Sequence, residues 1–99
     1  MVLSERAWRH IRERHPEVSH YKELIKDVLT EPEVILKGGR AERKAIRHIS
    51  KTHLGPKYLV VIYREENRQK VIITAYFTSD LRKAKGDQFG EHTSEAGKA

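Results

Sequence analysis

The chain has 99 residues, no cysteine, and 20 Lys and Arg against 14 Asp and Glu, which gives a formal net charge of +6. A chain of this length forms one small domain around one core, and the lack of cysteine excludes disulfide bonds, thiolate metal sites and a thiol nucleophile. Because no apolar run approaches the ~20 residues of a membrane-spanning helix and no export signal is visible, we expect a cytoplasmic protein that binds no membrane.

The positive charge favours polyanionic partners, because basic side chains release counterions from nucleic acid and steer its approach. Small domains that bind no nucleic acid can carry the same charge, which then serves solubility. Charge alone therefore leaves both interpretations open.

The first third of the sequence predicts two helices. Ser4 is a suitable N-cap and Pro16 ends the helical pattern, which gives a first helix over residues 4–15. A second helix is predicted over residues 19–29, where apolar side chains recur from Tyr21 at positions i, i+3, i+4, i+7 and i+8.

The two histidines of the first predicted helix lie on different faces. His15 shares a face with Trp8 and Ile11, whereas His10 lies on a charged flank one turn before Arg14. We therefore expect the two imidazoles to have different surroundings.

The rest of the sequence predicts strands. Short apolar or alternating segments at 34–36, 44–49, 58–64 and 71–78 are typical of strands, and a turn at 65–68 joins the last two as a hairpin. The segment at 44–49 also has helical propensity, so its assignment as a strand depends on its alternation alone.

This order of elements predicts an α+β domain in which two N-terminal helices pack on a three- to four-stranded antiparallel sheet. The domain is expected over residues 1–82, with one sheet face open. Residues 83–99 are rich in Lys, Gly, Ser and Glu and are predicted to form a flexible tail.

The last predicted strand presents two contrasting faces, because successive side chains of a strand alternate. One face is apolar and is expected to pack on the helices; it consists of Val71, Ile73, Ala75 and Phe77. The other becomes rich in hydroxyl groups and is expected to face a ligand; it consists of Ile72, Thr74, Tyr76 and Thr78.

Several common sites are absent from the sequence. The histidines do not show the spacing of metal ligands, so we expect no metal or other cofactor. Gly38 and Gly39 lack the spacing of a phosphate-binding loop, and no nucleophile elbow supports serine hydrolase chemistry.

The remaining polar residues form a set suited to metal-independent acid–base chemistry on RNA. Such a reaction needs a base for the 2′-hydroxyl, cations for the negative charge at phosphorus and an acid for the leaving 5′-oxygen. Candidates for proton transfer are His10, His15 and His48; for phosphate binding, Arg14 and Arg47; and for hydrogen bonding, Thr74, Tyr76 and Thr78.

Each candidate also has a structural interpretation. His15 could fill the edge of the core beside Pro16, and His10 could be a solvated surface residue. Threonine and tyrosine are common on exposed sheet faces because of their strand propensity. Arg47 and His48 alternate along their strand, so at most one of them can share the open face.

Segments in both halves of the chain together resemble the barnase, EndoU, colicin and RelE-like nuclease superfamily, the BECR fold. The first is His10-Ile11-x-x-Arg14-His15-Pro16-Glu17, followed by Pro32, Lys57-Tyr58-Leu59-Val60-Val61 and Ile73-Thr74-Ala75-Tyr76-Phe77-Thr78. The resemblance covers residues 8 to about 83. It implies N-terminal helices followed by a four-stranded antiparallel sheet.

The resemblance also implies a metal-independent endoribonuclease, toxin-like or phage-encoded, which cleaves RNA by 2′-hydroxyl attack. An acidic antitoxin or immunity protein is a candidate partner of such an enzyme. Its catalytic positions match His10, His15, Thr74 and Tyr76. Its RNA-binding positions match Arg14, Thr78 and either Arg47 or His48. The competing interpretations are a non-catalytic RNA-binding module and an interaction domain that docks another protein on its open sheet face.

Overall fold

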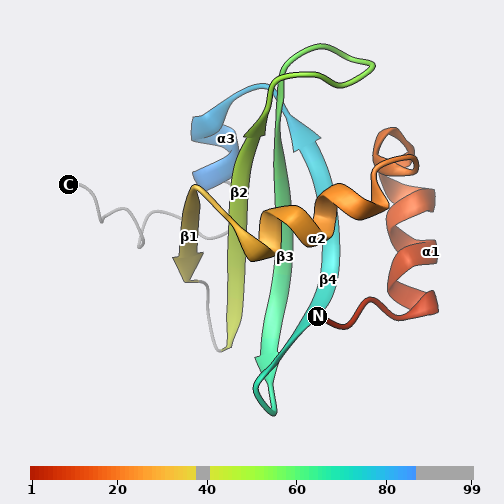
Figure 1. Ribbon diagram of the computed structural model, residues 1–99, viewed down its shortest axis with the longest axis vertical. Helices are drawn as coiled ribbons and strands as arrows, with labels where there is room; N and C mark the ends of the chain where they lie inside the picture. Colours follow the sequence, from red (N-terminus) through yellow and green to blue (C-terminus); the bar gives the residue numbers. More distant parts are fainter. Residues whose placement is uncertain (38–40, 87–99) are drawn as a thin grey trace.

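The computed structural model describes residues 1–37 and 41–86 (Figure 1). Its elements, in chain order, are α1 (Glu5–Arg14), the 3₁₀ helix η1 (Pro16–Val18), α2 (Lys22–Thr30), β1 (Val34–Lys37), β2 (Glu42–Ile49), β3 (Lys57–Glu66), β4 (Gln69–Thr78) and α3 (Leu81–Gly86). The four strands form one antiparallel sheet in the order β1-β2-β3-β4. The predicted α+β class and antiparallel sheet are confirmed. No helix of the described segments is long and apolar enough to span a membrane.

Local signals fix the bounds of α1. The Ser4 side chain accepts a hydrogen bond from the Ala7 backbone N–H at 3.0 Å, as an N-cap does. At the other end, the His15 N–H donates to the Ile11 carbonyl at 2.7 Å, and Pro16 then starts η1. Acidic Glu5 in the first turn and basic residues in the last turn both suit the helix dipole.

Pairing on both sides makes β2 a strand. Ile46 is paired with Val34 of β1 and Val60 of β3, and Ala45 with Ile35 and Val61. These partners lie far away in the sequence, which is why the local pattern alone was ambiguous. The strand predicted over 44–49 is confirmed and begins two residues earlier, at Glu42.

One face of the sheet, here called the helix face, is covered by α1, η1 and α2. Figure 1 shows α2 crossing the strands and α1 standing beside β4. The buried core on this face consists of Ile11, Val18, Ile25, Val28, Leu29, Ala45, Leu59, Val61, Tyr63, Ile72 and Ala75. Full burial of an aliphatic side chain contributes about 1.5–3 kcal/mol, so this cluster fixes the helices on the sheet.

A β-bulge changes the predicted faces of β4. Ile62 is paired with Thr74 but Tyr63 with Ile72, so Ile73 is an extra residue. On the N-terminal side of Thr74, the side chains therefore face the opposite way from the prediction. Ile72 joins the core of the helix face, and Ile73 packs on the other face of the sheet. The predicted positions of Ala75 and Phe77 are correct, whereas those of Ile72 and Ile73 were exchanged.

The opposite face, here called the α3 face, is not open as predicted. Ala84 of α3 is fully buried against Ile46, Val60 and Ile62. The buried Lys44 donates a hydrogen bond from Nζ to the Ala84 carbonyl at 2.7 Å. Helix α3 extends to Gly86, beyond residue 82; residues 87–99 of the predicted tail lie outside the described residues.

A local signal for α3 exists in the sequence. The Asp80 carboxylate accepts a hydrogen bond from the Arg82 N–H at 2.9 Å, and its carbonyl accepts one from the Ala84 N–H. Aspartate is a favoured N-cap. The polar composition after Asp80 obscured this short helix, which is held by two apolar side chains, Leu81 and Ala84.

Candidate functional site

The C-terminal end of α1 brings two histidines to the edge of the sheet. Because β4 is an edge strand, a side chain of α1 can reach around it to the α3 face. The ring centroids of His15 and Tyr76 are 5.5 Å apart, with the planes tilted by 34°. His10 meets His15 edge-on at 6.5 Å between centroids. We call His10, His15 and Tyr76 the histidine cluster.

The position of His15 follows from its place at the end of α1. It is the C-cap residue, where the chain leaves the helix before Pro16. Its Nδ1 lies 4.0 Å from Oε2 of Glu17, and the two side chains are 32% and 28% exposed. Because Nδ1 faces Glu17, Nε2 is the ring nitrogen available for proton transfer.

The surroundings of His15 favour its neutral form. Burial lowers the pKa of its imidazole below 6.5, Glu17 partly opposes this effect, and His10 and Arg14 lower the pKa further. At neutral pH the imidazole is therefore unprotonated and can accept a proton. Burial of the ring and the charges of His10 and Arg14 act in the same direction.

The lowered pKa predicts that His15 destabilises the fold as the pH falls. In the unfolded chain its pKa is 6.5, so below that value the unfolded state binds the proton more readily than the folded state. The stabilisation is complete above pH 6.5 and is lost as the pH falls toward the folded pKa. Urea unfolding of the wild type and His15→Gln from about pH 8 to about pH 5 checks this. The advantage of the wild type should shrink with falling pH, and a constant difference would contradict the assignment.

The structure does not present Thr74 to a ligand. Its hydroxyl oxygen is buried and has no hydrogen-bond partner among the described residues. It lies in the cross-strand row with Ile62 and Lys44, beneath the region that α3 covers. Thr74 therefore does not join the surface formed by the histidine cluster.

His48 and Thr78 lie on the same sheet face as Tyr76, one row further along. Tyr58 of β3 is paired with His48 on one side and Thr78 on the other. The rings of His48 and Tyr58 meet at 5.0 Å and 69°. The Thr78 hydroxyl accepts a hydrogen bond from the Asp80 N–H at 3.3 Å, so it also helps to begin α3.

The two basic candidates have different positions. Arg14 is exposed at the end of α1, close enough to His15 to influence its pKa. Arg47 lies on the helix face, where Nη1 is 3.9 Å from Oε1 of Glu31. As the strand alternation requires, only His48 of the Arg47–His48 pair shares the face of Tyr76.

Two aromatic arrangements were not predicted. The Trp8 ring has the Arg12 guanidinium at 5.8 Å and Lys22 Nζ at 5.4 Å from its centroid. The i, i+4 spacing of Trp8 and Arg12 was a usable signal for the first contact. These contacts place two cationic groups next to the Trp8 ring of α1.

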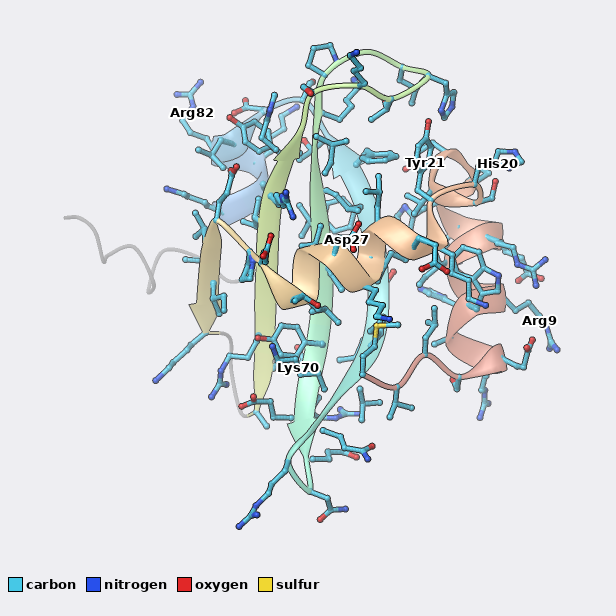
Figure 2. All side chains as sticks on the ribbon, viewed as in Figure 1. Arg9, His20, Tyr21, Asp27, Lys70 and Arg82 are labelled. Carbon is cyan, nitrogen blue, oxygen red and sulfur yellow. The ribbon has the colours of Figure 1, made fainter. Side chains whose placement is uncertain are left out.

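The second arrangement joins Tyr21 to His53. The Tyr21 hydroxyl accepts a hydrogen bond from the His53 backbone N–H at 2.9 Å and lies 2.8 Å from its Nδ1, and the rings stack at 5.6 Å. Figure 2 shows Tyr21 and His20 at the end of the molecule where α1 meets α2. Because 32 residues separate Tyr21 and His53, no local pattern could have predicted this contact.

Within residues 1–37 and 41–86, no group of three or more His, Asp or Glu side chains is arranged to hold a metal ion. The histidine cluster itself offers two imidazoles and a phenol, with the guanidinium of Arg14 nearby. Comparison of the chain with protein-family models, curated proteins and solved structures returned no match.

Proposed function

We propose that the protein is a metal-independent endoribonuclease of the BECR type, toxin-like or phage-encoded, with the histidine cluster as its active site. The observation that carries this proposal is the contact of His15 with Tyr76, together with the lowered pKa of His15. A neutral imidazole beside a second imidazole supplies both a base and an acid without a metal.

The proposed reaction assigns one proton transfer to each histidine. Nε2 of His15 takes the proton from the RNA 2′-hydroxyl, and the 2′-oxygen forms a bond to phosphorus. The bond from phosphorus to the 5′-oxygen breaks, and His10 donates a proton to that leaving oxygen. The products are a 2′,3′-cyclic phosphate and a 5′-hydroxyl. Arg14, at the end of the same helix, offsets negative charge at the phosphate.

The charge of α1 supports an RNA partner. Its exposed arginines, Arg6, Arg9, Arg12 and Arg14, outnumber its two glutamates. Basic side chains arranged along a helix bind the phosphate backbone with an affinity that falls steeply with salt. The same surface would bind an acidic antitoxin or immunity protein, which we include in the proposal.

An RNA cleavage assay in EDTA tests the proposed function. The purified protein should cleave single-stranded RNA and leave 2′,3′-cyclic phosphate ends, while an oligonucleotide with 2′-deoxyribose at every position should remain intact. Cleavage that requires added Mg²⁺, or that also cuts the deoxyribose strand, would exclude the proposed reaction.

A non-catalytic RNA-binding module is the second candidate. It is favoured by the positions of Thr74, whose hydroxyl is buried, and Thr78, whose hydroxyl is engaged with Asp80. Of the three hydroxyl groups expected on β4, this leaves Tyr76 beside the histidines, where its ring could stack on a base. Salt-sensitive RNA binding without cleavage would identify this function. If the protein neither binds nor cleaves RNA, a protein-interaction domain is favoured.

A further inference from the structure

A second basic surface lies on the helix face, between the C-terminal half of α2 and the turn that joins β3 to β4. A cavity of about 380 Å³ opens there, and its polar lining comes from Lys26, Thr30, Arg68, Gln69 and Lys70. Three of these side chains are cationic, and the lining contains no carboxylate. The lining of this cavity therefore carries a local excess of positive charge.

A neighbouring cavity shows that the charge excess is local. It shares Lys26 and Thr30 with the first cavity, but Asp27, Glu31 and Arg47 complete its lining. Arg47 lies 3.9 Å from Glu31, and the lining of this neighbour contains carboxylates as well as cations. Of these two cavities, the first has cations and no carboxylate in its lining.

Of these three cations, Lys70 makes contacts that hold α2 on the sheet. Lys70 Nζ donates a hydrogen bond to the Leu29 carbonyl at 3.1 Å and lies 5.5 Å from the Tyr63 ring centroid. It thereby satisfies a carbonyl at the C-terminal end of α2. Lys26 and Arg68 have no ion-pair partner among the described residues.

Arg68 occupies a turn position that favours glycine. Asn67 and Arg68 form the two-residue turn with φ of +52° and +66°, a conformation in which glycine is preferred at the second position. Arginine is unfavourable there, because its Cβ crowds the left-handed backbone. Non-glycine residues in such conformations cluster at binding sites, and this one lines the first cavity.

We propose that this cavity binds a phosphate group, with Arg68 and Lys26 as its charged ligands and the Gln69 amide as a hydrogen-bond donor. The site goes beyond the proposed active site, since Lys70 and Tyr76 are six residues apart on β4, about 20 Å along the strand, and lie on opposite faces. Its ligand is a free phosphate or a phosphodiester of a nucleic-acid strand, which present the same oxygens.

An NMR titration with inorganic phosphate, at an ionic strength held constant with chloride, tests the site. We expect saturating shifts of the backbone amide signals of Thr30, Gln69 and Lys70. Arg68→Gly and Lys26→Gln should each weaken binding about tenfold, which corresponds to one lost charge-assisted contact. Arg68→Lys should retain most of the affinity, and Lys51→Gln, which removes an exposed charge elsewhere, should leave it unchanged.

Arg68→Gly separates loss of binding from loss of fold. Glycine suits the left-handed turn, so this variant should melt at or above the temperature of the wild type while binding phosphate less well. A second titration with a deoxyribose oligonucleotide, which the proposed ribonuclease cannot cleave, distinguishes the two ligand sources. Binding of the strand alone identifies a phosphodiester site.

The proposal is overturned if neither phosphate nor the strand gives saturating shifts at these amides. It is also overturned if Lys51→Gln weakens binding as much as Arg68→Gly, because the effect then follows net charge. Neither result depends on RNA cleavage, so the phosphate site and the proposed active site are tested separately.

Discussion

Replacing His15 with glutamine should lower the rate of RNA cleavage by about 10²–10⁴-fold, the usual contribution of a positioned acid or base. Glutamine retains a hydrogen-bonding side chain of similar length but cannot accept the 2′-hydroxyl proton. His15 is one-third exposed, so the substitution leaves the core intact. Initial rates on a fluorescent RNA oligonucleotide measure the effect, and circular dichroism verifies the fold.

His20→Gln is the matched control, because His20 is an exposed histidine in the same part of the chain, outside the cluster. Its cleavage rate should equal that of the wild type. In the wild type, cleavage should decline below pH 6.5 as His15 becomes protonated, with a midpoint below the ordinary histidine pKa. Equal rates for His15→Gln and the wild type would remove His15 from the mechanism.

Lys44→Ala should destabilise the protein by about 2–4 kcal/mol, which places it among the large effects of single substitutions. The Lys44 side chain is fully buried, so its truncation creates a cavity. It also removes the hydrogen bond from Nζ to the Ala84 carbonyl, and an unsatisfied buried carbonyl adds to the loss. Urea unfolding at neutral pH measures the change.

Two further variants identify the cause. Lys51→Ala removes an exposed lysine and should change the free energy of unfolding by less than about 0.5 kcal/mol. Lys44→Met keeps most of the volume but not the donor, so it should be more stable than Lys44→Ala. If Lys44→Ala is as stable as the wild type, the contact between Lys44 and α3 contributes nothing to the fold.

The histidine cluster was partly predictable from the sequence. Helical spacing put His10 and His15 on one element, and strand alternation put Tyr76 and Thr78 on one face. Their approach required α1 to lie at the edge of β4, which follows from sheet order and not from any local pattern. Thr74 was assigned to the same surface because the polar composition after Asp80 obscured the signal for the helix above it.

The phosphate-binding cavity could not have been predicted in this way. Lys26 belongs to α2, whereas Arg68 and Lys70 belong to the β3–β4 hairpin, and their charges resembled those of any basic surface. The left-handed conformation of Arg68 is equally hidden, since a turn was predicted but its type was not. Only the packing of α2 on the sheet brings these cations to one cavity.

The sequence by itself determined the class of fold, because helices and strands differ in the spacing of their apolar residues, and this spacing is visible in each segment alone. It determined α1 through Ser4 and Pro16, and the hairpin through two β-rich segments and a polar turn. Tertiary structure alone decided the bulge at Ile73, the burial of Lys44 under α3 and the contact of His15 with Tyr76. Each of these depends on free energy gained between segments distant in the chain, and no single segment contains that information.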